Sequence, residues 1–171
     1  MKTKFNFSLI AFAILFYSCG QKLPDFKLVS IVGDTISSEF PEGKVVYINV
    51  FETWCVPCLS EIPELNKLKE KHPNILFIAM TPAKKSKVLE FQKKNAFNFN
   101  VISDAGDLCK KMKVHGFPSH FFVDKHGTLR SSSLALTTSW NHTATEEEIR
   151  TRYRELTYNI LDSLMTKYEN E

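Results

Sequence analysis

The sequence predicts a layered α/β domain in which a β-sheet is flanked by helices. Two strongly apolar stretches, residues 44–51 and 75–80, are rich in strand-forming side chains and apolar on both faces, as in strands that are covered on both sides. Each is followed by a stretch with helical periodicity, residues 59–71 and 86–95. Strands that alternate with helices at this spacing are typical of α/β folds.

Length and composition agree with one such domain. The chain has 171 residues, of which 43% are hydrophobic and 14 are Phe, enough for one well-filled core. Its net charge of +3 falls to +1 when Lys2 and Lys4 are left out. A nearly neutral chain gives no reason to expect nucleic acid as a partner.

Shorter elements are predicted around these strands. The turn signal Gly33-Asp34 separates two stretches with strand character, residues 23–28 and 35–37. A third such stretch, residues 97–102, precedes a short helix. The sequence therefore predicts a hairpin near the N-terminus and one more strand in the sheet.

The short helix contains Cys109. Asp104 precedes it and can cap its first turn. Cys109 shares an apolar helix face with Ala105, Leu108 and Met112. This pattern predicts a free thiol that is buried as a small hydrophobic side chain.

The C-terminal part of the chain predicts a hairpin, a loop and a helix. Residues 125–128 form a turn signal before a last strand at 129–132, and residues 134–144 are rich in Ser and Thr, with Trp140 expected to pack. Thr145 and Glu148 form a capping-box pattern. A helix at about 145–168 follows, with an apolar stripe made of Ile149, Tyr153, Leu156, Ile160 and Leu164. We expect this helix to cover the sheet, and a partner-binding helix is the alternative.

The N-terminus predicts an export signal. Lys2 and Lys4 precede an apolar run, residues 9–17, that is too short to cross a bilayer as a stable helix. The run ends before Cys19, and this arrangement resembles a bacterial lipoprotein signal at residues 1–18 in which Cys19 is lipidated. An uncleaved anchor and an ordinary secretory signal are the alternatives. All three place the domain, residues 19–171, outside the cytoplasm, where disulfides persist.

The main candidate for chemistry is Cys55-Val56-Pro57-Cys58, between the strand at 44–51 and the helix at 59–71. A Cys-x-x-Cys pair between a strand and a helix is typical of a thiol-disulfide redox site. The free N–H groups and dipole of a helix N-terminus stabilise a thiolate. Cys55 is therefore expected to be the exposed attacking thiolate and Cys58 the resolving thiol.

Other uses of the pair are less well supported. A zinc site needs four ligands, and the sequence has no second pair at ligand spacing. A structural disulfide that closes so short a loop stabilises a protein little. Copper binding by the pair together with His120 stays open as an alternative because thiolate and imidazole suit that metal. A scaffold module in which the two cysteines are redundant and no turnover occurs is the other alternative. His115 and His126 fall in turn-like stretches and are expected to be exposed. We expect no resident metal and no cofactor besides the redox-active Cys55–Cys58 disulfide.

Several motifs together resemble the TlpA/ResA-like thiol-disulfide oxidoreductases of the thioredoxin-fold superfamily. The resemblance extends over residues 23–132 and is carried by Leu23-Pro24-Asp25-Phe26, residues 43–51, Thr53-Trp54-Cys55-Val56-Pro57-Cys58 with Glu61 and Pro63, and Gly116-Phe117-Pro118 with Phe121, Asp124 and Gly127. It implies a thioredoxin-like fold with a central mixed sheet and an N-terminal hairpin extension. A thiol peroxidase is disfavoured, because enzymes of that class have a single attacking cysteine in a Pro/Thr-rich loop rather than a Cys-x-x-Cys pair.

The resemblance also implies a partner surface. Pro118 is expected to follow a cis peptide and to face the cysteines, which makes it part of the catalytic site. Trp54, Pro57 and Phe117 border this surface and are expected to bind substrate. The implied partners are thiols and disulfides of exported proteins, a membrane or periplasmic electron donor, and the membrane itself through Cys19. The implied location is the periplasm-facing cell envelope, or the exterior if the lipoprotein signal is not used. The chain departs from the group at Phe51, Glu52 and Phe117, which leaves the substrate open.

A carboxylate is a candidate for moving the proton of Cys58. Asn49 aligns with the buried aspartate of cytoplasmic thioredoxins, and an amide cannot accept a proton. Glu61 comes three residues after Cys58 and so shares its helix face. A buried carboxylate at that place has a raised pKa and can serve as a general base. Glu52 is the competing base, and an ordinary solvated charge at Glu61 is the plain alternative.

The direction of the reaction follows from the same stretch. No Lys, Arg or His lies in the motif to lower the pKa of the Cys55 thiol far below neutral pH, and Glu52 and Glu61 oppose such a shift. The family resemblance favours a reductase over an oxidant. With it, the lack of a cation leads us to expect a reduction potential nearer that of thioredoxin than that of strong periplasmic oxidants.

Overall fold

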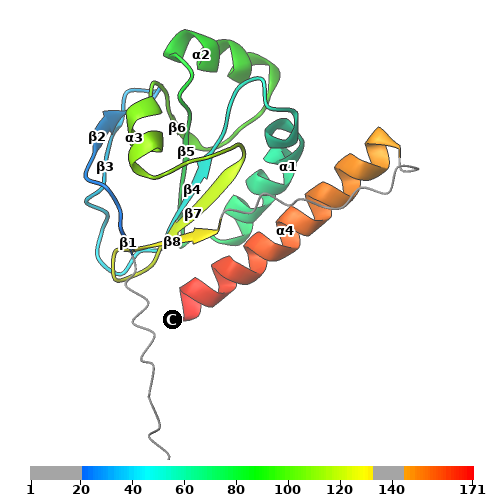
Figure 1. Ribbon diagram of the computed structural model, residues 1–171. Coiled ribbons are helices and arrows are strands. Elements are labelled where there is room, and N and C mark those ends of the chain that lie inside the picture. Colours follow the sequence, from blue (N-terminus) through cyan, green and yellow to red (C-terminus); the bar gives the residue numbers. More distant parts are fainter. Residues whose placement is uncertain (1–20, 133–144) are drawn as a thin grey trace, which may run out of the picture.

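The computed structural model describes residues 21–132 and 145–171 (Figure 1). The signal segment at 1–18, Cys19 and the loop at 134–144 with Trp140 lie outside these residues. What the sequence predicts for these segments stays a prediction.

The centre of the molecule is a six-stranded mixed sheet with the order β1-β8-β7-β4-β5-β6. The strand bounds are β1 Gln21–Lys22, β4 Val46–Val50, β5 Leu76–Met80, β6 Asn100–Ile102, β7 Ser119–Val123 and β8 Thr128–Ser132. β4, β5 and β6 run parallel, whereas β7, β8 and β1 are added antiparallel. The mixed sheet predicted from the family resemblance is therefore confirmed.

β4 is the middle of this sheet, and all five of its residues are buried. Successive side chains of a strand point to opposite faces. Tyr47 accordingly packs in the core on one face, and Val46, Ile48 and Val50 pack on the other. The apolar character of residues 44–51 thus reflects burial on both sides, as the sequence predicts.

One face of the sheet is covered by helices α1 (Val56–Lys71), α2 (Lys85–Lys94) and α4 (Glu146–Asn170). Leu65 and Leu68 of α1, Val88 of α2, and Leu161 and Met165 of α4 are fully buried there. Many of the phenylalanines fill the same core: Phe51, Phe77, Phe91, Phe97, Phe99 and Phe122. Their edge-to-face and tilted ring contacts stabilise the core in addition to the burial of apolar area.

The other face is covered by α3 (Gly106–Lys111) and by a separate hairpin of β2 (Lys27–Val29) and β3 (Thr35–Ser37). The hairpin turn includes Gly33, whose φ of 102° is a conformation that glycine adopts without strain. Cys109 of α3 is a buried free thiol, as predicted. Figure 1 shows α3 and the hairpin on the side of the sheet opposite α1 and α4.

Two local predictions are wrong. The helical pattern of residues 86–95 predicts Val88, Leu89 and Phe91 on the inward face, but 43% of Leu89 is exposed, because two buried positions three residues apart already fill the inward face of so short a helix. Asp104 does not cap α3, whose N-cap is Ala105. Asp104 has a φ of 55°, and its carboxylate accepts the N–H of Lys85 at the start of α2.

Helix α4 lies along α1, and its capping box of Thr145 and Glu148 is present as predicted. Its most buried side chains are Tyr153, Thr157, Leu161 and Met165, four residues apart in turn. The predicted stripe is therefore rotated: Tyr153 is correct, but Leu156, Ile160 and Leu164 are only half-buried, and the side chain of Ile149 lies outside the description. The apolar pattern did not reveal this face because one of its buried residues, Thr157, is polar. No helix in the described ranges is long and apolar enough to cross a membrane.

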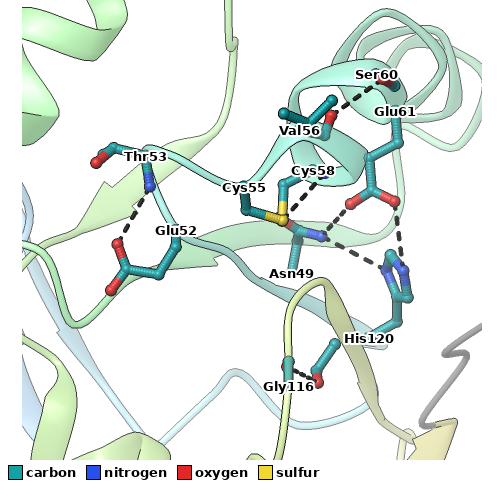
Figure 2. The surroundings of a disulfide bond; sticks show 11 residues. Asn49, Glu52, Thr53, Cys55, Val56, Cys58, Ser60, Glu61, Gly116 and His120 are labelled. Atoms are coloured by element: carbon teal, nitrogen blue, oxygen red, sulfur yellow. Dashed lines mark hydrogen bonds and ion pairs between the residues drawn. A yellow bond between two sulfur atoms is a disulfide. The ribbon is translucent and has the colours of Figure 1, made fainter.

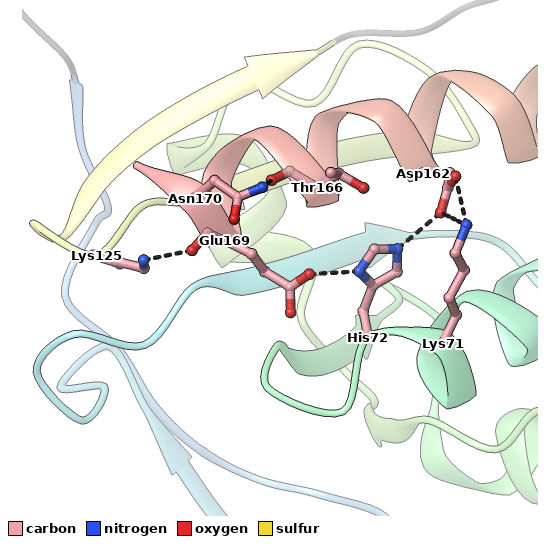
Figure 3. Close-up of polar contacts among 7 residues, drawn as sticks. All are labelled: Lys71, His72, Lys125, Asp162, Thr166, Glu169 and Asn170. Atoms are coloured by element: carbon pink, nitrogen blue, oxygen red, sulfur yellow. Dashed lines mark hydrogen bonds and ion pairs between the residues drawn. The ribbon is translucent and has the colours of Figure 1, made fainter.

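A buried histidine fixes the C-terminal half of α4 (Figure 3). His72, at the end of α1, is 4% exposed. Its Nε2 lies 2.9 Å from Asp162 Oδ1 and its Nδ1 lies 2.6 Å from Glu169 Oε2. Lys125 donates to the backbone carbonyl of Glu169 at 2.6 Å. Two carboxylates of α4 thus share one ring of α1, and this fixes how the two helices lie together.

We expect His72→Ala to destabilise the protein. The change removes two hydrogen bonds to charged groups and opens space under α4, so the free energy of unfolding should fall by about 1–3 kcal/mol. Urea unfolding measures this loss. The matched control is His126→Ala, because His126 is exposed in a turn and its removal should change stability by less than about 0.5 kcal/mol. Equal stability of His72→Ala and the wild type would contradict the expectation.

Candidate active site

The two motif cysteines form a disulfide at the N-terminus of α1. Cys55 and Cys58 are joined, with their Cα atoms 5.3 Å apart. Cys55 is the N-cap residue of α1, and its Sγ accepts the backbone N–H of Cys58 at 3.3 Å. Pro57 occupies the first helical turn, where its missing N–H costs nothing. The helix therefore begins at the attacking sulfur, as the motif predicts.

Cys55 itself is less exposed than predicted. The residue is 4% exposed, whereas the neighbouring Trp54 and Val56 are 72% and 49% exposed. The reason is that its sulfur is bonded to Cys58 and turned toward the helix backbone. Cys55 therefore lies between two exposed apolar neighbours.

The proline loop lies at the same end of the sheet. The Phe117–Pro118 peptide is cis, as the resemblance implies. Ser119 pairs with Val50 at the end of β4, which brings Pro118 close to the start of the cysteine loop. The ring of the half-buried Phe117 meets the ring of Trp54 edge to face, with the centroids 6.4 Å apart. Trp54 and Phe117, predicted to bind substrate, thus come together beside Cys55.

Glu61 is completely buried beneath the disulfide, on the same face of α1 as Cys58. Its Oε1 accepts a hydrogen bond from Asn49 Nδ2 at 2.9 Å (Figure 2). Burial raises the pKa of Glu61 to about 8, and interactions with Asn49 and Tyr153 lower it in part. Of the two explanations given for Glu61, the solvated surface charge is excluded by this burial.

A histidine and two tyrosines complete the buried polar cluster. The Tyr47 hydroxyl lies 2.7 Å from His120 Nδ1, and His120 Nε2 lies 3.5 Å from Glu61 Oε2. Burial lowers the pKa of His120 to about 4, so the ring is neutral at physiological pH. Burial and the nearby Glu61 raise the pKa of Tyr47 and of Tyr153, so both hydroxyls keep their protons.

The sequence indicated only part of this cluster. Tyr47 comes two residues before Asn49 on the same strand, so strand alternation could have placed both on one face. Tyr153 belongs to α4, and only the packing of α4 on α1 brings it to Glu61.

Glu52, the competing base, is half-exposed and accepts the N–H of Thr53 at 3.2 Å. Figure 2 shows its carboxylate pointing away from the Glu61 side of the loop. Glu52 is therefore less well placed than Glu61 to exchange a proton with the shielded Cys58.

Three histidines, His115, His120 and His126, lie close in sequence to the proline loop. His115 and His126 are exposed, as predicted, whereas His120 is buried in the sheet. Across residues 21–132 and 145–171, no group of three or more His, Cys, Asp or Glu side chains could hold a metal ion.

The geometry agrees with the comparison to known families. A model of the AhpC/TSA family matches residues 19–132, which is more than half of the chain. The chain belongs to the AhpC/TSA family. Among curated relatives, the thiol:disulfide interchange protein DsbE of Pseudomonas fluorescens is 34% identical over 65% of this chain and 64% of its own length. Thiol-disulfide oxidoreductase ResA of Bacillus thuringiensis is 32% identical over 63% and 65%, respectively.

Solved structures show that this AhpC/TSA member has a thioredoxin-like fold. The thioredoxin domain of a thiol-disulfide oxidoreductase from Bacteroides vulgatus matches with a TM-score of 0.63 at 16% identity, covering 85% of this chain and 96% of that one. A thioredoxin-family thiol:disulfide interchange protein from Chlorobium tepidum matches with a TM-score of 0.58 at 20% identity, covering 81% and 97%. The predicted fold and the resemblance to ResA-like proteins are therefore confirmed. The chain spans just under two thirds of the length of the DsbE and ResA relatives.

The raised pKa of Glu61 predicts a pH-dependent stability. Its ordinary pKa of 4.5 rises to about 8 on folding, so the folded state binds one more proton than the unfolded state between these values. The free energy of unfolding should fall across this range as pH rises, by at most about 1.4 kcal/mol per pH unit. Glu61→Gln removes this contribution.

Urea unfolding of the oxidised protein at several pH values between 5 and 8 measures the difference. The wild type should lose stability relative to Glu61→Gln as pH rises, and Glu64→Gln, on the more exposed side of α1, is the control. Parallel curves for the wild type and Glu61→Gln would contradict a raised pKa.

Proposed function

We propose that this protein is an extracytoplasmic thiol-disulfide oxidoreductase that reduces disulfides in exported proteins. The observation that carries the proposal is the Cys55–Cys58 disulfide at the N-terminus of α1, bordered by the exposed Trp54 and Val56 and the ring of Phe117. Two cysteines that pair with each other within one motif support disulfide exchange over peroxide reduction. The names of the DsbE and ResA relatives support the same reaction class.

The reaction has two exchange steps. The Cys55 thiolate attacks a substrate disulfide, forms a bond to one of its sulfurs and releases the other as a thiolate. Cys58 then loses its proton and attacks Cys55, which releases the second substrate thiolate and forms the Cys55–Cys58 disulfide. The substrate gains two electrons, and a dithiol donor must return two electrons to the protein for the next cycle.

Glu61 is proposed to exchange the proton of Cys58. The carboxyl group is buried on the same helix face, and a pKa of about 8 lets it gain and lose a proton near neutral pH. As a carboxylate it accepts the proton when Cys58 attacks. As a carboxylic acid it returns a proton when the electron donor reduces the disulfide.

The binding surface is proposed to consist of Trp54, Pro57 and Phe117 around Cys55, with the cis peptide before the buried Pro118 at the same end of the sheet. Pro57 is exposed and Phe117 is half-buried. An extended segment of a partially unfolded substrate suits such a shallow apolar surface. The apolar rim gives affinity without selecting one sequence.

The location is inferred from the N-terminal sequence. The apolar run at 9–17 and Cys19 support export and a lipid anchor on the periplasmic face of the cell envelope. A reductase would find substrates in an oxidising compartment, because misformed disulfides persist there. The electron donor must then be a dithiol protein in or facing the same compartment.

We expect Cys55 to carry the exchange. The reduced protein should accelerate the reduction of insulin disulfides, and Cys55→Ser should abolish this activity. Cys58→Ser should instead accumulate a mixed disulfide between Cys55 and its substrate, because the resolving thiol is missing. Non-reducing electrophoresis after acid quenching detects this species. The buried Cys109→Ser is the control and should retain activity. Activity that survives in Cys55→Ser would remove the proposed function.

We expect the potential of the disulfide to be that of a reductase. The first turn of α1 contains no cation that would stabilise the Cys55 thiolate. The buried Glu61 carboxyl group, when charged, would repel that thiolate. A redox titration against glutathione or dithiothreitol should give a value nearer thioredoxin, about −270 mV, than a strong oxidant at about −120 mV. A value near the oxidant would reverse the proposed direction.

We expect Glu61→Gln to slow the second exchange step and leave the first unchanged. Loss of a general base costs roughly 10²-fold or more in the rate of the assisted step. Stopped-flow fluorescence with a labelled disulfide substrate separates Cys55 attack from resolution. Glu52→Gln is the matched control because its carboxylate is half-exposed and points away. A slower resolution in Glu52→Gln alone would transfer the role to Glu52.

A further inference from the structure

The proposed reaction uses only one member of the polar cluster beneath the disulfide. The cluster joins Tyr47 and Asn49 of β4, Glu61 of α1, His120 of β7 and Tyr153 of α4. Tyr47, Asn49, Glu61 and His120 are each at most 1% exposed. Burying four polar side chains in this way is costly unless they satisfy one another. Their arrangement therefore defines the protonation of each group.

The contacts of His120 determine which ring nitrogen carries the proton. Its Nδ1 faces two donors, the Tyr47 hydroxyl at 2.7 Å and the Asn49 amide nitrogen at 3.5 Å. The Tyr47 hydroxyl keeps its proton because burial raises its pKa. An unprotonated Nδ1 accepts from both groups. A protonated Nδ1 could donate to the Tyr47 oxygen but would oppose the Asn49 amide, which can only donate. The neutral ring therefore carries its proton on Nε2.

That proton faces the carboxyl group of Glu61. His120 Nε2 lies 3.5 Å from Glu61 Oε2, and Asn49 Nδ2 donates to Oε1 at 2.9 Å (Figure 2). The 3.5 Å distance is longer than a formed N–H···O bond. A charged carboxylate attracts this N–H, whereas a proton on Oε2 would oppose it.

We propose that His120 is a positioning residue for proton exchange at Glu61, with Tyr47 fixing its tautomer and its Nε2–H stabilising the carboxylate. This inference rests on the proposed role of Glu61 as the proton acceptor for Cys58. Cys58 gives its proton to Glu61, and Glu61 later returns it. His120 keeps its own proton throughout and acts only as a donor of a hydrogen bond.

A neutral donor suits this task better than a cation. Burial alone disfavours the carboxylate, and a hydrogen bond to the charged form opposes that effect. A positively charged partner would lower the pKa of Glu61 so far that the carboxylate would be a weak base. The neutral His120 leaves the pKa of Glu61 near the pH at which it must exchange protons.

Within residues 21–132 and 145–171, the polar groups that face His120 and Glu61 come from β4, α1 and α4. β4 contributes Tyr47, whose ring stacks on His120 with the planes 15° apart, and Asn49. α1 contributes Glu61 and α4 contributes Tyr153, whose interaction lowers the pKa of Glu61. Glu61 is thus the member of this cluster that titrates near neutral pH.

The test compares His120→Leu, His120→Gln and the wild type. Two quantities are measured: the pH dependence of mixed-disulfide resolution, and the titration of the Glu61 carboxyl group by ¹³C NMR in the oxidised protein. His120→Leu should raise both midpoints by about one pH unit, because one donor to the carboxylate is lost. His120→Gln should restore most of the shift, since its amide N–H can take the place of Nε2–H. The exposed His126→Gln is the control and should leave both midpoints unchanged.

Tautomer measurement provides a second test that does not depend on folding of the Leu variant. ¹⁵N NMR of the wild type should show His120 protonated at Nε2, and Tyr47→Phe should increase the share protonated at Nδ1. A wild-type ring protonated at Nδ1 would overturn the inference.

The outcomes separate this inference from the proposed function. If Glu61→Gln slows resolution but the Glu61 titration is the same in His120→Leu and the wild type, the role of His120 is overturned and that of Glu61 stands. If the titration shifts as expected but Glu61→Gln resolves at the wild-type rate, His120 stabilises the carboxylate as inferred and Glu61 is not the proton acceptor.

Discussion

The burial of one carboxyl group under the disulfide is the constraint on which the active site depends. A carboxylate without water is strongly disfavoured, so Glu61 shifts its pKa to about 8 and requires donors around it. Asn49 meets one oxygen and His120 faces the other. These side chains must lie in the sheet, and the sheet must therefore carry polar groups where an ordinary core would be apolar. The alternation of β4 makes this possible, since Tyr47 and Asn49 point to the same face.

On the opposite side of the disulfide from Glu61, the side chains are apolar and exposed rather than polar and buried. The sulfur atoms are bordered by Trp54 and Val56, which are largely exposed although they are apolar. Exposed apolar side chains cost little individually, but they give a partner chain a surface to cover. The disulfide therefore separates an apolar, accessible side from a polar, inaccessible one. In the proposed reaction, electrons are exchanged on the first side and protons on the second.

How much the sequence could predict depended on whether the information was local. The strand at 44–51, the cysteine motif and the shared helix face of Cys58 and Glu61 were predictable, because apolar patterning, a short motif or helix spacing defines each of them. The cis peptide before Pro118 was expected only from the family resemblance. Asp104 was misplaced since its carboxylate caps a helix that precedes it in the chain. The inward face of α4 was misplaced because a buried Thr157 interrupts its apolar pattern. The role of His120 required knowledge of which strands pair, since Tyr47 lies 73 positions away in the chain.

Helix α4 covers the active site although it lies outside the segment that the family model matches. The segment that the AhpC/TSA family shares stops at residue 132, before α4 begins. Yet Tyr153 of α4 interacts with Glu61, and His72 fixes the same helix at its other end. A fragment cut at the family boundary would keep both cysteines and the proline loop but let water reach Glu61. The burial of Glu61 therefore depends on a helix outside the segment that the family model matches.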